Sequence, residues 1–208
     1  MSRRTPARTL LLQIATAAAI FVALTADVLL GGPLTGLDDE VRDAVRAHQV
    51  PALHQLANDV TLLLAPPVTV GVLLLAALMC VVRSRSLRRP LLLTAGALTG
   101  LLLLVLAMKG AVARGGPSGD PGDGAGYFPS GHTSGALVGL GTSAVLLIGP
   151  GRTRRRALVA VAAVGGLVAV SLVYCAYHWL TDVLAAGAVG WLVLTVVVLL
   201  ERQAASRD

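Results

Sequence analysis

The chain has 208 residues, of which 55% are hydrophobic and only 13% are charged, and it carries a formal net charge of +6. This apolar content is too high for one soluble core of that size, so the composition indicates a polytopic membrane protein. The positive charge does not indicate a nucleic-acid partner, because the arginines gather at alternate ends of the apolar runs, as the positive-inside rule describes.

Six apolar runs are long enough to cross a hydrocarbon layer of about 30 Å, which takes about 17–25 helical residues. No glycine- and serine-rich linker or charged block separates them, so we expect one all-α domain over residues 1–208, built as a six-transmembrane-helix bundle. The predicted spans are 9–30, 60–82, 91–108, 131–149, 157–176 and 183–200.

The arginine distribution predicts a multi-pass protein of the cell membrane with both termini in the cytoplasm. The loops at 31–59, 109–130 and 177–182 are then extracytoplasmic. The N-terminus also resembles a secretory signal, but cleavage would leave the second span with the wrong charge parity, so we expect a retained anchor. Cys80 and Cys175 fall at opposite membrane faces in this topology and cannot pair.

The segment after the first span mixes apolar and charged residues. Leu37, Val41 and Val45 recur there at helical spacing, which predicts an amphipathic helix lying on the outer surface. His48 and His54 lie in or after this helix without metal-ligand spacing, so we expect both of them at the surface. Asp27, near the outer end of the first span, is interpreted as a structural residue at the interface.

Prolines and glycines in the spans predict how the helices pack. Pro66-Pro67 imply a kink in the second span, which neighbouring helices can accommodate. Glycines spaced by four residues let two helices approach closely. They occur in the third and fourth spans at Gly96, Gly100, Gly131, Gly135 and Gly139.

Lys109 is the only lysine in the chain, and it directly follows the apolar run 101–108. A cation at membrane depth costs roughly 2.5–3.5 kcal/mol on insertion scales, so we expect Lys109 to face a partner or a water-filled cavity. The alternative is a lysine that only extends its amine to the interface. Arg114, five residues later, brings a second positive charge to the same outer loop.

The stretch Phe128-Pro129-Ser130-Gly131-His132-Thr133 is a polar hinge between two apolar runs. Pro129 breaks the preceding backbone, Ser130 is a preferred helix N-cap, and a helix follows. The unpaired amides at such a helix start, together with the helix dipole, make a seat for phosphate, with His132 beside it. Ordinary capping chemistry explains the same residues without a ligand.

His178 and Asp182 are separated by four residues, so they share one face of a helix. A carboxylate in this place can fix the tautomer and orientation of the imidazole, which makes the histidine a candidate nucleophile or base. The alternative is an interfacial pair that only caps the helix.

A lysine with an arginine, then Pro-Ser-Gly-His, then His-x-x-x-Asp, all on the outer side of a six-span chain, resembles the type 2 phosphatidic acid phosphatase family. The resemblance covers residues 60–200 and extends to the vanadium haloperoxidases of the same superfamily. It implies neither a metal nor another cofactor. The roles it implies are nucleophile for His178, orienting acid for Asp182, proton donor for His132, and phosphate binding for Lys109, Ser130 and Gly131.

The sequence departs from the family pattern at two phosphate-binding arginines. The first motif of the family is a lysine, six residues and Arg-Pro, whereas Lys109 here leads to Gly116-Pro117. The third motif begins with Ser-Arg, where this chain has Ser171-Leu172. Losing two charged hydrogen bonds costs roughly two to four orders of magnitude in rate if nothing compensates. Arg114 is our candidate for a substitute phosphate-binding group.

The favoured hypothesis is a hydrolase that acts on a lipid phosphate or isoprenoid diphosphate through a phosphohistidine at the extracytoplasmic face. The alternative is a catalytically silent protein of the same fold that binds lipid phosphate or serves as a scaffold. A vanadate-dependent haloperoxidase shares the site, but the membrane spans argue against it. The expected partners are the membrane and its lipid substrate, and the sequence leaves homo-oligomerisation open.

Overall fold

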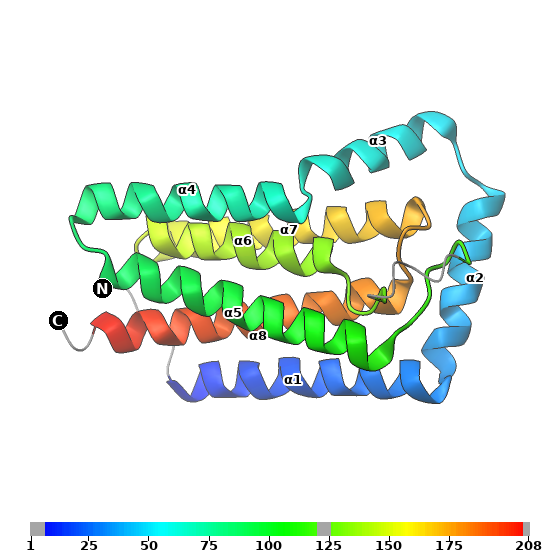
Figure 1. The fold of residues 1–208 in the computed structure, drawn as a ribbon, viewed down its shortest axis with the longest axis horizontal. Coiled ribbons are helices and arrows are strands. Elements are labelled where there is room, and N and C mark those ends of the chain that lie inside the picture. The colour runs from blue at the N-terminus through cyan, green and yellow to red at the C-terminus, as the bar shows by residue number, and fades with distance from the viewer. Residues whose placement is uncertain (1–6, 120–125, 206–208) are drawn as a thin grey trace.

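The structure, a computed structural model, describes residues 7–119 and 126–205 and is all-helical over these ranges. Six long helices run side by side along one axis, and two shorter ones lie at one end of the bundle (Figure 1). The predicted all-α membrane bundle is therefore confirmed. The long helices are α1 (Ala7–Leu30), α4 (Pro66–Ser84), α5 (Arg88–Val112), α6 (Gly131–Leu147), α7 (Arg152–Tyr174) and α8 (Leu180–Ala205); the short ones are α2 (Pro33–Ala47) and α3 (Pro51–Leu63).

Among the described residues, five helices are long and apolar enough to cross a membrane: α1, α4, α5, α7 and α8. The remaining predicted span, 131–149, corresponds to α6, which has 17 residues and is shorter than these five. It packs against α4, α5, α7 and α8 in the middle of the bundle, and most of its side chains are buried. Because neighbours cover it on several sides, α6 presents little surface to lipid.

The predicted kink at Pro66-Pro67 is wrong, because the chain forms two helices there instead of one bent span. Helix α3 ends at Leu63, and α4 begins at Pro66 after Ala65, whose backbone is extended with φ −60° and ψ 152°. Proline suits the first position of a helix, where no amide donor is needed, and it disfavours a helical conformation in the residue before it. The prolines therefore start α4 and let α3 leave the bundle axis (Figure 1).

Helix α2 lies across the end of the bundle, as predicted for the amphipathic segment (Figure 1). Asp27, in α1, fixes the corner between the two helices. Its carboxylate accepts hydrogen bonds from the amides of Leu34 at 3.3 Å and Thr35 at 3.1 Å, at the start of α2. Asp27 is therefore structural, and it satisfies amides that a helix leaves unpaired in its first turn.

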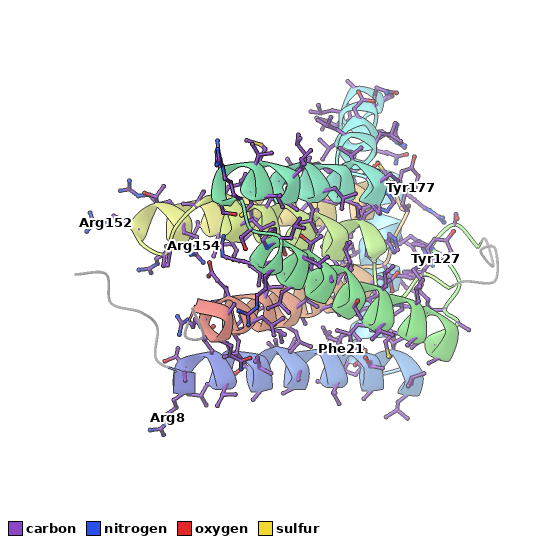
Figure 2. All side chains as sticks on the ribbon, turned by 60° about the vertical axis from the view of Figure 1, so that its left-hand side comes forward. Arg8, Phe21, Tyr127, Arg152, Arg154 and Tyr177 are labelled. Carbon is purple, nitrogen blue, oxygen red and sulfur yellow. The ribbon has the colours of Figure 1, made fainter. Side chains whose placement is uncertain are left out.

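Charged groups tie the helices together at the opposite end. The Glu201 carboxylate of α8 accepts hydrogen bonds from Arg154 of α7 and from Arg89 of α5, the latter at 2.6 Å. Figure 2 shows Arg8, Arg152 and Arg154 at this end, with Tyr127 and Tyr177 at the other. Arg8, Arg152 and Arg154 therefore lie at the end of the bundle opposite α2.

Glycines allow α4 and α6 to approach closely. A Cβ atom placed on Gly139 would lie 2.8 Å from the backbone oxygen of Thr69, and one on Gly135 would lie 3.7 Å from the Thr69 hydroxyl. Real Cβ atoms do not come as near to a backbone atom as the first of these distances. The predicted packing role is therefore confirmed for Gly139 and Gly135 but not for Gly131, where a Cβ would meet nothing within 4 Å.

We expect Gly139→Ala to lower the thermal unfolding midpoint of the protein in detergent. The added methyl group would force α4 and α6 apart, and overpacking of this kind costs about 1–3 kcal/mol. Gly71→Ala is the matched control, since a Cβ at Gly71 in α4 meets nothing within 4 Å. Equal midpoints for the two variants would contradict the close approach of α4 and α6.

Candidate active site

The predicted pair of His178 and Asp182 lies at the start of α8, at the same end of the bundle as α2. The ring nitrogen Nδ1 of His178 is 3.1 Å from Oδ2 of Asp182. The same oxygen accepts a hydrogen bond from the amide of Trp179 at 3.2 Å, so it also caps the helix. Asp182 is fully buried and His178 is 9% exposed. The carboxylate thus orients the imidazole and caps α8 at once.

A backbone hydrogen bond brings the second predicted motif to the first. The amide of Ser130 donates to the carbonyl oxygen of Asp182 at 3.1 Å. Ser130 is the N-cap of α6, as predicted, and its hydroxyl accepts from the amide of Thr133 at 3.4 Å. The helix start that offers Gly131 and His132 is therefore held against the start of α8.

Segment 126–128 connects the lysine loop to His178. The amine of Lys109 donates to the carbonyl oxygen of Gly126 at 2.5 Å, so this lysine faces a partner as predicted. The amide of Tyr127 donates to the carbonyl oxygen of Arg114 at 2.9 Å, and the Tyr127 ring lies edge-on to the His178 ring with centroids 5.5 Å apart.

Arg114 contacts two carboxylates. Its Nη1 donates to Asp182 Oδ1 at 3.0 Å and to the Thr181 hydroxyl at 2.6 Å, while its Nη2 donates to Asp38 Oδ2 at 2.7 Å. The guanidinium also lies 5.0 Å from the centre of the Trp179 ring. The structure therefore brings Arg114 to the site, where its terminal nitrogens already have acidic partners.

The two positions without the family's arginine are occupied in different ways. A Cβ on Gly116 would lie 2.7 Å from Cζ of Tyr127, so the tyrosine ring fills the space next to this glycine. Leu172 is 1% exposed and belongs to an apolar cluster with Val168 and Val183. Neither position supplies a polar side chain to the site, although the carbonyl oxygen of Leu172 accepts a hydrogen bond from the amide of His178 at 3.3 Å.

Two further features concern what the site can hold. In the described part of the chain, no group of three or more His, Cys, Asp or Glu side chains is placed to hold a metal ion. A cavity of about 1660 Å³ is lined mainly by residues of α6, α7 and α8, and His178 is not among its lining residues. It runs from Thr133 to Arg155, and apolar side chains form most of its walls.

Sequence reasoning missed Asp38, which is 2% exposed in spite of its place on a predicted surface helix. A signal was present, because Asp38 shares a helical face with the apolar residues Leu34, Val41 and Val45, at offsets of four, three and seven. An acidic residue on the apolar face of an amphipathic helix needs a buried partner. Its partners, Arg114 and Thr181, are too distant in sequence to be found by pattern.

Comparisons with known proteins place these features in context. A family model described as the PAP2 superfamily matches residues 94–205. The structure is similar to the crystal structure of the first transmembrane PAP2-type phosphatidylglycerolphosphate phosphatase from Bacillus subtilis, with a TM-score of 0.81. The match covers 92% of this chain and 96% of that chain at 20% sequence identity, a level at which the likeness concerns the fold. No curated protein sequence matches this chain.

Proposed function

Because the chain belongs to the PAP2 superfamily, we propose that it is a metal-independent phosphatase that hydrolyses a lipid phosphate or isoprenoid diphosphate. The observation that carries this proposal is the hydrogen bond from Ser130 to the carbonyl of Asp182. This bond holds the start of α6, where a phosphate would bind, against the segment of His178, which would attack the phosphorus. Family membership and the fold support a membrane lipid phosphatase, and the site residues supply the proposed steps.

His178 is the proposed nucleophile. An ionised carboxylate can only accept hydrogen bonds, so Asp182 holds the proton of His178 on Nδ1 and leaves Nε2 with its lone pair. In the first step Nε2 forms a bond to phosphorus while the bond from phosphorus to the leaving oxygen breaks. The positive charge that develops on the ring is stabilised by Asp182, which lies 3.1 Å away.

Four groups at the start of α6 and the end of α5 are proposed to bind the phosphate and transfer protons. Lys109, Ser130 and the Gly131 amide bind the phosphoryl oxygens, as helix N-termini bind anions elsewhere. His132 donates a proton to the leaving oxygen in the first step. It then takes a proton from the water that attacks phosphorus, which releases phosphate and restores His178.

The site is proposed to face the extracytoplasmic side. Its segments lie at the end of the bundle that carries Tyr127 and Tyr177, whereas Arg8, Arg152 and Arg154 lie at the opposite end (Figure 2). Arginine-rich ends of transmembrane helices remain in the cytoplasm by the positive-inside rule. Both ends of the chain then lie in the cytoplasm.

One observation favours a second candidate function, a silent protein that binds lipid phosphate. The places of the two family arginines are taken by the Tyr127 ring over Gly116 and by the apolar Leu172. Such replacements are expected in a chain that has lost phosphate-binding groups needed for hydrolysis. The retained pair of His178 and Asp182 favours the enzyme, since a binding protein has no need of a nucleophile held by an acid.

We expect purified protein in detergent to release phosphate from a panel of lipid phosphates and diphosphates, with or without a chelator. Vanadate should inhibit, because a trigonal-bipyramidal vanadate on His178 resembles the transition state. His178→Ala should abolish turnover, whereas His132→Ala should spare activated esters whose leaving group needs no proton. Activity that a chelator removes and a divalent metal restores would rule out this mechanism.

We expect Gly116→Arg alone to lower the unfolding midpoint, because its side chain meets the Tyr127 ring. In Tyr127→Ala/Gly116→Arg that contact is relieved, and the new guanidinium should raise kcat/KM above that of Tyr127→Ala. Phosphate release and thermal unfolding measure both effects. If the parent is inert and only the triple variant with Leu172→Arg hydrolyses lipid phosphate, the silent-binder hypothesis is correct.

The topology can be tested with an impermeant thiol reagent in intact cells. Cys80 and Cys175 are each 6% exposed, and burial raises the pKa of the Cys175 thiol, so we expect little background labelling. Ser118→Cys, in the exposed loop next to the site, should react in intact cells. Arg156→Cys, at the start of α7, should react only after permeabilisation, and the reverse pattern would invert the proposed orientation.

A further inference from the structure

We propose that Asp38 is a positioning residue for the hydrolysis, acting through Arg114 on Asp182. This inference rests on the proposed function and adds to it a group outside the three family motifs. Asp38 belongs to α2, the helix that crosses the end of the bundle (Figure 1). It would make this outer helix part of the machinery that sets the position of His178.

Asp38 holds the backbone next to Asp182. Its Oδ1 accepts a hydrogen bond from the amide of Thr181 at 2.9 Å, and its Oδ2 accepts from the Thr181 hydroxyl at 2.5 Å. Both Asp38 and Thr181 are almost completely buried. Two hydrogen bonds to the residue before Asp182 fix the start of α8 where the orienting carboxylate leaves the backbone.

Arg114 connects the two carboxylates directly. Its Nη2 lies 2.7 Å from Asp38 Oδ2, and its Nη1 lies 3.0 Å from Asp182 Oδ1. Hydrogen bonds between charged groups are the stronger kind, and the planar guanidinium fixes the direction of each. With Oδ1 of Asp182 held by Arg114, Oδ2 is directed to His178, at 3.1 Å.

The burial of these charges supports a positioning role over a purely stabilising one. A buried ion pair is often no more stabilising than apolar residues of similar size, because desolvation offsets the attraction. Removing one partner is costly, since it leaves the other charge buried and uncompensated. Without Asp38, Arg114 would keep only Asp182 as an acidic partner and would be free to shift, taking the carboxylate away from His178.

This role differs from the phosphate contact that the sequence predicts for Arg114. A group that binds phosphate equally in the ground state and the transition state changes KM when it is removed. A group that positions Asp182 changes the chemical step, so its loss lowers kcat with little effect on KM. The two assignments therefore give different kinetic signatures.

The test compares Asp38→Asn with Asp39→Asn in the phosphate-release assay. Asp39 is the neighbour on the same helix, its side chain is 60% exposed, and it forms an ion pair with Arg42 at the surface. We expect Asp38→Asn to lower kcat at least about tenfold with KM changed less than about twofold. Asp39→Asn should match the parent. Unchanged kcat in a folded Asp38→Asn, or a rise in KM alone, would overturn the inference.

Arg114 supplies the coupling test. Arg114→Ala should cost at least about tenfold in kcat/KM, as much as Lys109→Ala, but through kcat. The double variant Asp38→Asn/Arg114→Ala should lose no more than the more damaging single change, because the asparagine oxygen can still accept from the Thr181 amide and the substitution acts mainly through Arg114. Additive losses would show that Asp38 acts independently of Arg114 and would overturn the proposed route.

The outcomes separate this inference from the proposed function. If the parent protein releases no phosphate, the proposed function fails and the inference falls with it; if the parent is active and Asp38→Asn equals it, only the inference fails. If Asp38→Asn does not fold, Thr181→Val removes the hydroxyl that Asp38 and Arg114 share. The same selective loss of kcat is then expected, and an unchanged kcat would overturn the inference.

Discussion

The buried carboxylate of Asp182 is the group on which the geometry of the site depends. Burying a carboxylate is costly unless donors surround it, and Asp182 collects them from separate parts of the chain. His178 and the Trp179 amide precede it in sequence, while Arg114 reaches it from beyond the end of α5. Its carbonyl oxygen accepts the amide of Ser130 at the start of α6. Satisfying this one residue brings three segments of the chain to one place.

Features set by neighbouring residues could be predicted from the sequence. The spacing of His178 and Asp182 determines that they share a helical face, and Ser130 caps the helix that begins one residue later. The lengths of the apolar runs predict the long helices, because the thickness of the bilayer fixes how long a span must be. In each case the physical cause lies within a few residues or in composition.

Features set by distant residues could not be predicted in this way. Asp38 is buried because Thr181 and Arg114 come to it, and those residues lie 143 and 76 positions away. A proline pair in an apolar run allows either a kink or a helix start, and the packing of α3 against α7 decides between them. The position of Tyr127 beside Gly116 likewise depends on a contact made in the folded protein, the hydrogen bond from the Tyr127 amide to the Arg114 carbonyl.

Helix α8 is fastened at both ends, by Asp182 in its first turn and by Glu201 in its last. At 1.5 Å per residue these carboxylates lie roughly 28 Å apart along the helix axis, close to the hydrocarbon thickness of about 30 Å. Each pairs with arginines outside α8, so the helix cannot tilt or slide alone without breaking buried ion pairs. If the bilayer is thinner or thicker than the bundle, either the bilayer deforms or the whole molecule tilts. The hydrophobic mismatch is then shared by all the helices.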